Sequence, residues 1–223
     1  MDLHLNSIEA RVLGALIEKE VTTPEYYPMS LNALTNACNQ KSNREPVMDL
    51  SDNDVVIAID TLKDKKLSWQ FSSAGGRVPK YEHNIRSLFS FSKGEIAVIC
   101  ILLLRGPQTV GEIRTRTDRL YSFSSLEETE KTIRGLAERP DGPFVAELPR
   151  QPGHKESRFV HLFSGKPDTS LVLETSDGIT RHESKQITTT NDRLIAVEEE
   201  IVALRKEILE LREQFIDFKK QLE

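Results

Sequence analysis

The chain has 223 residues, of which 38% are hydrophobic and 29% are charged, and its formal net charge at pH 7 is −5. This length accommodates two small domains and an appendage. The hydrophobic share excludes an intrinsically disordered chain. The acidic balance is unusual for a protein that binds DNA, although local groups of lysine and arginine can still attract a phosphate backbone.

The N-terminal residues and the cysteines indicate the compartment. The first residues lack the basic and apolar regions of a signal peptide. The strongest apolar run, 96–104, is far shorter than the roughly 20 residues of a membrane helix. Cys38 and Cys100 lie in apolar helical patterns, which favours buried core thiols over a disulfide or a metal site. We therefore expect a reduced, cytoplasmic protein without a membrane segment.

The first ninety residues have the pattern of three helices followed by a β-hairpin. Asn6 or Ser7 caps a first helix, Ser30 opens a second, and Ser51 opens a third. Between the second and third helices, residues 39–46 are polar and end in a proline, which predicts a loop. Two short β-like runs around a glycine-containing turn follow at 69–71 and 78–81.

Residues 91–165 repeat this order. Laying Glu9 over Glu95 places Leu16 on Leu102, and further along, with a shorter offset, Ser51 falls on Ser125 and Ile59 on Ile133. Apolar and polar positions therefore agree between the repeats. The helices of the second repeat open at Ser92, Thr109 and Ser125, and its strands are expected at 144–148 and 158–163.

These patterns predict a mainly α fold with small β-hairpins, in the α+β class. Three helices followed by a hairpin is the plan of a winged helix, so we predict two tandem winged-helix domains. The expected domains are residues 1–90 and 91–165, followed by a linker over 166–190 and a coiled-coil helix over 191–223.

The C-terminal segment has a heptad pattern. Its isoleucines at position a and leucines at position d favour a parallel two-stranded coil, so we predict a homodimer. An additional apolar row at position b leaves an alternative open, in which this helix folds back onto the chain's own domains. The predicted dimerisation residues are Leu194, Val197, Ile201, Leu204, Ile208, Leu211, Phe215 and Phe218.

The sequence lacks the motifs of common active sites. The five histidines are scattered without metal-ligand spacing, and no phosphate-binding glycine loop or nucleophile elbow occurs. Most carboxylates lie on expected helix surfaces, where they are solvated. We therefore predict a protein that is not an enzyme and that has no cofactor and no metal.

Both third helices are acidic where a winged helix usually reads bases. In that mode the third helix enters the major groove with its N-terminal residues at the base edges. Here those residues include Asp52 and Asp54 in the first repeat and Glu127 and Glu128 in the second. Carboxylates repel phosphates, and counterion release requires cations. We expect neither third helix to read DNA.

The cations lie instead on the loop after the second helix and on the hairpins, which we call the wings. We predict a contact led by the wings with the duplex backbone or the minor groove. The candidate nucleic-acid-binding residues are Lys41, Arg44, Arg77, Lys80, Arg150, Lys155 and Arg158.

Structural roles compete with this interpretation. Arg44 and Glu45 could lock the polar loop to the body of the domain instead of holding a phosphate. Arg114, Arg116 and Arg119 could pair with the acidic neighbouring helix.

Two runs of the chain resemble the YceH family of uncharacterised bacterial proteins. They are Val-Thr-Thr-Pro-Glu-Tyr-Tyr-Pro-Met-Ser-Leu-Asn at 21–32 and Ala-Cys-Asn-Gln-Lys-Ser-Asn-Arg-Glu-Pro-Val at 37–47. The resemblance extends over roughly residues 1–165. It implies two winged-helix domains, and it brings no activity, ligand or catalytic residue.

Two functions follow from these patterns. The first is a dimeric, nucleic-acid-associated regulator that contacts DNA through its basic wings. The alternative is a protein–protein adaptor that uses acidic winged-helix surfaces and does not bind DNA. An enzyme is the least supported class.

Overall fold

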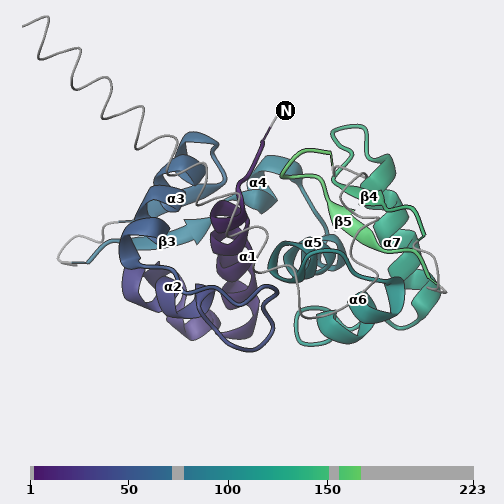
Figure 1. Cartoon of the computed structure of the whole chain (residues 1–223), viewed down its shortest axis with the longest axis horizontal. Helices are drawn as coiled ribbons and strands as arrows, with labels where there is room; N and C mark the ends of the chain where they lie inside the picture. Colours follow the sequence, from purple (N-terminus) through teal and green to yellow (C-terminus); the bar gives the residue numbers. More distant parts are fainter. Residues whose placement is uncertain (1–2, 72–77, 151–155, 167–223) are drawn as a thin grey trace, which may run out of the picture. The chain divides into compact units, whose positions relative to one another are not determined.

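A computed structural model describes residues 3–71, 78–150 and 156–166 (Figure 1). They belong to a single compact unit, Met1–Leu173. We call residues 3–90 the first half and residues 91–166 the second half. The fold is mainly helical with small antiparallel sheets, as predicted. The predicted coiled-coil helix and all but the first residue of the predicted linker lie outside the described residues.

The first half contains helices, a short 3-10 turn and a small sheet. The strands of the sheet are ordered β1-β3-β2 and are antiparallel. The elements are α1 (Ser7–Thr22), η1 (Pro24–Tyr26), β1 (Met29–Ser30), α2 (Leu31–Cys38), α3 (Asp52–Asp64), β2 (Ser68–Phe71), β3 (Lys80–His83) and α4 (Ile85–Phe89).

The helices begin at the expected capping residues. Asn6, and not Ser7, caps α1: its side-chain oxygen accepts from the backbone nitrogens of Ile8 and Glu9 at 2.9 and 2.8 Å. Ser51 and Asp54 form a reciprocal capping box at α3. Such caps satisfy backbone N–H groups that the first helical turn leaves without partners.

The second half repeats the helices but has a smaller sheet. Its elements are α5 (Lys93–Arg105), α6 (Val110–Thr117), α7 (Leu126–Glu138), β4 (Val145–Glu147) and β5 (Phe159–His161). Where the first half has a third strand, Gln108 forms an isolated bridge with Phe159. Helix α6 begins after its expected cap, Thr109, and ends at Thr117.

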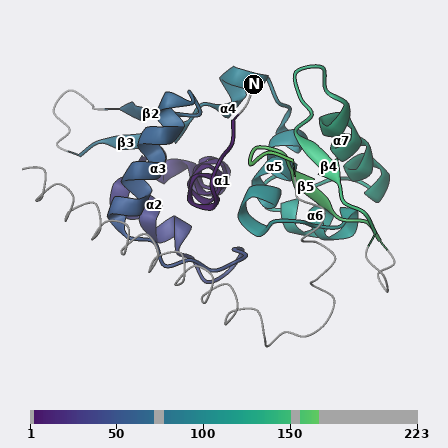
Figure 2. The same cartoon turned by 45° about the horizontal axis from the view of Figure 1, so that its top comes forward.

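Helices α1 and α5 lie side by side and join the halves (Figures 1 and 2). Gly14 permits this approach: a Cβ atom there would lie 2.9 Å from Leu104 and 3.1 Å from Leu103. The Cys100 thiol donates to the Gly14 carbonyl at 3.5 Å. One hydrophobic core therefore runs through both halves.

Both cysteines belong to that core. Cys38 and Cys100 are buried free thiols, as predicted. Burial raises the pKa of Cys38 to about 12 and raises that of Cys100 further, so both thiols stay protonated at neutral pH. Within the described part of the chain, no helix is both long and apolar enough to cross a membrane.

Candidate functional site

The N-terminal turns of α3 and α7 are acidic and solvent-facing, as expected. Asp52 accepts a hydrogen bond from the Thr35 hydroxyl at 2.6 Å. Glu128 accepts from the Ser124 hydroxyl and backbone nitrogen at 2.6 and 2.8 Å. These bonds to Ser124 lower the pKa of Glu128, and bonds from Ser51 lower that of Asp54. The helices therefore present ionised carboxylates, which repel the phosphates that a docked third helix would approach.

Arg44 is not available to a phosphate, which corrects its place among the nucleic-acid-binding candidates. Its side chain is fully buried and forms a bidentate pair with Glu18, at 2.6 Å from Nη2 and 3.2 Å from Nη1. It also donates to the carbonyls of Ala37 and Asn43. Arg44 therefore locks the polar loop to the body of the domain, because each nitrogen of its guanidinium donates to a protein oxygen.

Burial alone would raise the pKa of Glu18, but the hydrogen bonds and the charge of Arg44 outweigh it and hold that pKa below its ordinary value. The carboxylate therefore stays ionised, and its charge is directed toward Arg44. A buried pair of this kind is favourable only when both partners are present.

Two further side chains hold the same loop. Arg11, buried in α1, donates to the carbonyls of Cys38 and Pro46 at 3.1 and 2.5 Å. The Asn39 amide exchanges two bonds of 2.8 Å with the backbone of Leu50. The polar loop is thus fixed at both ends, and it presents its middle residues, 41–43, to solvent.

These middle residues face the second half across a cleft of about 510 Å³, which we call the inter-half cleft. The end of α1 and the polar loop form one wall, and α5 and the region of α6 form the other. Its lining residues are Glu18, Lys19, Thr22, Thr23, Gln40, Lys41, Ser42, Asn43, Ile101, Arg116, Arg119 and Leu120.

Basic side chains dominate the charge of this cleft. Lys19 and Lys41 come from the first half and Arg116 and Arg119 from the second. Among the lining residues Glu18 is the single carboxylate, and Arg44 already compensates it. The structure thus places Lys41, one of the candidate nucleic-acid-binding residues, in the same cleft as Arg116 and Arg119 of the second half.

Arg114 and Arg116 do not pair with carboxylates of α7, contrary to what the structural alternative predicted. Arg116 pairs within its own helix, with Glu112 at 3.5 Å. Arg114 donates to the carbonyl of Ser124, in the turn before α7, at 3.4 Å. On α7, Glu130 pairs with Arg134. Each helix therefore satisfies much of its own charge through pairs four residues apart.

The first wing exposes aromatic side chains beside a lysine. Trp69 is 52% exposed and Phe71 is 47% exposed. They lie opposite Glu82 and Lys80 in the antiparallel register. Tyr81 and His83 of β3 are buried, so the alternation of the strand turns these four residues to the outer face. Arg77, also predicted here, lies outside the described residues.

The second wing differs, because its arginine is turned inward. Arg158 Nη1 donates to the Pro107 carbonyl and to Glu112, both at 2.9 Å. Arg150 is exposed but engaged in an interaction, and Lys155 lies outside the described residues. So do the eight predicted dimerisation residues.

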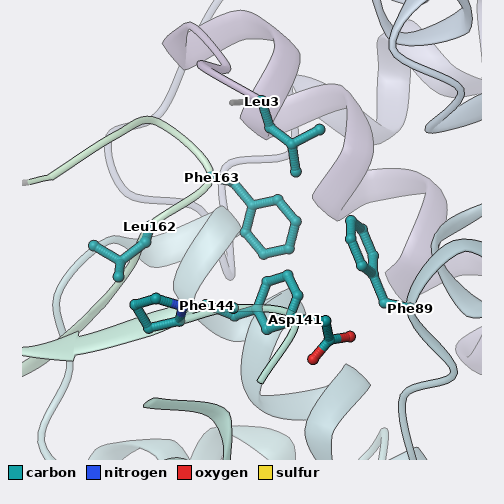
Figure 3. A pocket seen from close by; sticks show the side chains of 8 residues that line it. Leu3, Phe89, Asp141, Phe144, Leu162 and Phe163 are labelled. Atoms are coloured by element: carbon teal, nitrogen blue, oxygen red, sulfur yellow. The ribbon is translucent and has the colours of Figure 1, made fainter. Parts of the chain in front are cut away.

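A smaller pocket of about 70 Å³ lies among aromatic rings at the junction of the halves (Figure 3). Leu3, Phe89, Phe144 and Phe163 converge there. Small-molecule sites usually span about 300–1,000 Å³, so this pocket is a packing gap and not a ligand site. Among the described residues, no group of three or more histidine, cysteine or acidic side chains could hold a metal ion.

Comparisons with known proteins point to one family. Residues 5–154 match DUF480, a protein family of unknown function. The chain is 50% identical over 198 residues to a UPF0502 protein of Geobacter sulfurreducens, across 89% of each chain. It is 55% identical over 170 residues to a UPF0502 protein of Geotalea daltonii, across 76% of this chain and 77% of that one. A UPF0502 protein of Vibrio campbellii is 49% identical over 192 residues, across 84% and 88%. The resemblance to a family of uncharacterised bacterial proteins is confirmed.

Proposed function

Because the chain belongs to the DUF480 family, whose function is unknown, we propose its role from its geometry: a non-enzymatic, nucleic-acid-associated regulator with two winged-helix domains. The first wing makes the principal contact, while the acidic N-termini of α3 and α7 face away from the nucleic acid.

The element order supports the winged-helix assignment. The first half runs α1-β1-α2-α3-β2-β3, and its sheet has the order β1-β3-β2. A hairpin that directly follows the third helix is what defines a wing. The second half has the same helix order and a hairpin after α7, with the Gln108 bridge in place of the first strand.

The observation that carries the nucleic-acid proposal is the outer face of the first wing. It combines exposed Trp69 and Phe71 with Lys80, which has no ion pair among the described residues. Aromatic rings stack on bases of any sequence for about 1–3 kcal/mol per base, and a lysine supplies the phosphate contact. Exposed apolar side chains grouped on one face are a feature of interaction sites.

Trp69 makes a direct test possible, because it is the chain's single tryptophan. We expect an oligonucleotide added at low salt to quench its fluorescence and the affinity to fall as salt rises. The Lys80→Glu variant should lose most of this binding, and Phe71→Ala should weaken it by roughly tenfold, the equivalent of about 1.4 kcal/mol.

The control for charge is Lys131→Glu, which makes the same change on an exposed position of α7. It should bind as the wild type does. If the oligonucleotide leaves Trp69 fluorescence unchanged at low salt, the wing does not bind nucleic acid and the proposal fails.

The same wing favours a second candidate, a protein–protein adaptor. Trp69, Phe71 and Val78, which is 57% exposed and lies just before β3, are exposed apolar side chains of the type that protein interfaces bury. Affinity capture on the full chain with and without nuclease separates the two functions. Partners that remain after nuclease and that require Trp69 support the adaptor; partners that disappear support the nucleic-acid role.

The regulator is further proposed to be a homodimer through its C-terminal heptads. Replacing Leu204 and Leu211, both at position d, by glutamate should convert a dimer into a monomer. Glu199→Lys, at the outward position f, is the matched control. Sedimentation equilibrium measures the mass, and a monomeric wild-type chain would contradict this part of the proposal.

A further inference from the structure

The inter-half cleft has the size and charge of a site for a small anion. Its volume of about 510 Å³ lies within the range of small-molecule sites. Lys19, Lys41, Arg116 and Arg119 line it. Neither Lys41 nor Arg119 has a carboxylate partner among the described residues. The cleft therefore holds a concentrated excess of positive charge.

One guanidinium in the cleft has a donor without a partner. Nη1 of Arg116 is buried and makes no hydrogen bond with the described residues, while Nη2 of the same side chain pairs with Glu112. A buried N–H group left unpaired costs about 1–3 kcal/mol or more. Arg116 lines the cleft with a side chain that is 27% exposed, and a guanidinium fork matches the geometry of phosphate oxygens.

The opposite wall is held in place before any ligand arrives. Arg44, Arg11 and Asn39 fix the polar loop. Asn43 has a φ of 60°, a left-handed conformation that asparagine tolerates better than most residues. Arg105 of the second half donates to the Asn43 side chain. Lys41 is therefore presented on a rigid loop, which reduces the entropy lost on binding.

Two of the neutral lining residues have hydroxyls that are already engaged. The hydroxyls of Thr22 and Thr23 donate to carbonyls of α1, at 2.9 and 3.3 Å. The ligand donors are consequently the cations, together with the Ser42 hydroxyl and the side-chain NH2 groups of Gln40 and Asn43. Such a set favours a multiply charged group over a neutral polar molecule.

We propose that the inter-half cleft binds a phosphate-bearing ligand between Lys19 and Lys41 on one side and Arg116 and Arg119 on the other. The ligand bridges the two halves and stabilises their junction by mass action. This proposal is independent of the wing: the cleft can bind its ligand whether or not Trp69 contacts nucleic acid.

Isothermal titration of the full chain with inorganic pyrophosphate tests the site. We expect saturable binding with one molecule per chain, a higher melting temperature, and no change in Trp69 fluorescence. Arg116→Gln and Lys41→Gln should each weaken binding by roughly tenfold, as the loss of one charge-assisted contact implies. Arg134→Gln removes an arginine of the same type from an exposed pair on α7 and should bind as the wild type does.

Circular dichroism of each variant shows whether it is folded. The absence of binding at millimolar pyrophosphate, or equal binding by Arg116→Gln and the wild type, would overturn the proposal. A single-stranded oligonucleotide distinguishes the sources of phosphate. If it displaces pyrophosphate from the wild type, the cleft holds a nucleic-acid backbone; if it does not, the cleft holds a small phosphorylated molecule.

Discussion

The two halves share a helical plan and differ in the segments that connect it. In the first half, residues 39–51 separate α2 from α3, whereas the second half has the shorter segment 118–125 between α6 and α7. The longer segment contains the polar loop and its buried arginine. The first wing exposes Trp69 and Phe71, whereas the second directs Arg158 toward α6.

This difference shows how one scaffold can carry surface chemistry on one copy and structural contacts on the other. The helices and caps repeat because each copy must bury the same kind of apolar face. The loops are free to diverge, and sites are commonly built on loops that a rigid scaffold positions. The first half therefore carries the wing on which the first proposal rests, and it supplies two of the four cations of the inter-half cleft, Lys19 and Lys41.

The largest expected effect on stability comes from replacing Arg44, the buried arginine of the polar loop. Arg44→Ala removes the bidentate partner of Glu18, leaves that carboxylate with Lys19 alone, and should destabilise the protein by about 3–5 kcal/mol. Denaturant unfolding measures this change. Arg134→Ala, which breaks the exposed pair with Glu130 on α7, should leave the midpoint within error, because exposed ion pairs contribute little. Similar midpoints for both variants would mean that the polar loop is not held by its buried pair.

A second prediction concerns the junction that the halves share. Gly14→Val forces side-chain atoms against Leu104 and Leu103, and such overpacking should cost about 1–3 kcal/mol. Gly135 on α7 is exposed with nothing near its Cβ position. Gly135→Ala should therefore stabilise the protein by about 0.4–1 kcal/mol. A stable Gly14→Val variant would contradict the close packing of α1 against α5.

The third and smallest effect separates two histidines at corresponding positions of the wings. Nδ1 of both rings is buried without a partner among the described residues, but Nε2 of His83 contacts Glu20 at 3.2 Å, whereas His161 has no carboxylate partner there. Burial lowers the pKa of His161 to about 4. The unfolded chain binds a proton at this residue near pH 6.5, so stability falls as pH drops from there toward 4.

Between pH 7 and pH 5.5 the His161 contribution should be about 1 kcal/mol. The His161→Asn variant should lose that part of the pH dependence. Urea unfolding at both pH values measures the difference. If the variant and the wild type have the same pH dependence, His161 is not buried in its neutral form.

Much of the fold followed from local signals. The capping residues Ser30, Ser51, Ser92, Thr109 and Ser125 all open helices where they were expected, because a side-chain oxygen at the N-cap acts on its own helix. Errors occurred at ends: the strand expected at 78–81 is β3, Lys80–His83, since strand limits depend on pairing partners that lie far along the chain.

The candidate sites were harder to predict because they depend on which face is covered. Trp69 and Phe71 lie two residues apart in β2 and so share one face, but such spacing does not show that this face is exposed. Arg44 and Lys41 are three residues apart in one polar run, yet Arg44 is buried and Lys41 is solvent-facing. The carboxylate that pairs with the buried Arg44 belongs to Glu18, which lies far from it in the sequence, on helix α1.

The sequence by itself determined the repeated order of helices and hairpins and the acidic character of both third helices, because these depend on residues close together in the chain. Only the tertiary structure decided which basic side chains line the same cleft. Lys41 and Arg116 come together because α1 packs on α5 through Gly14, and close packing between distant segments is not encoded in the period of either one.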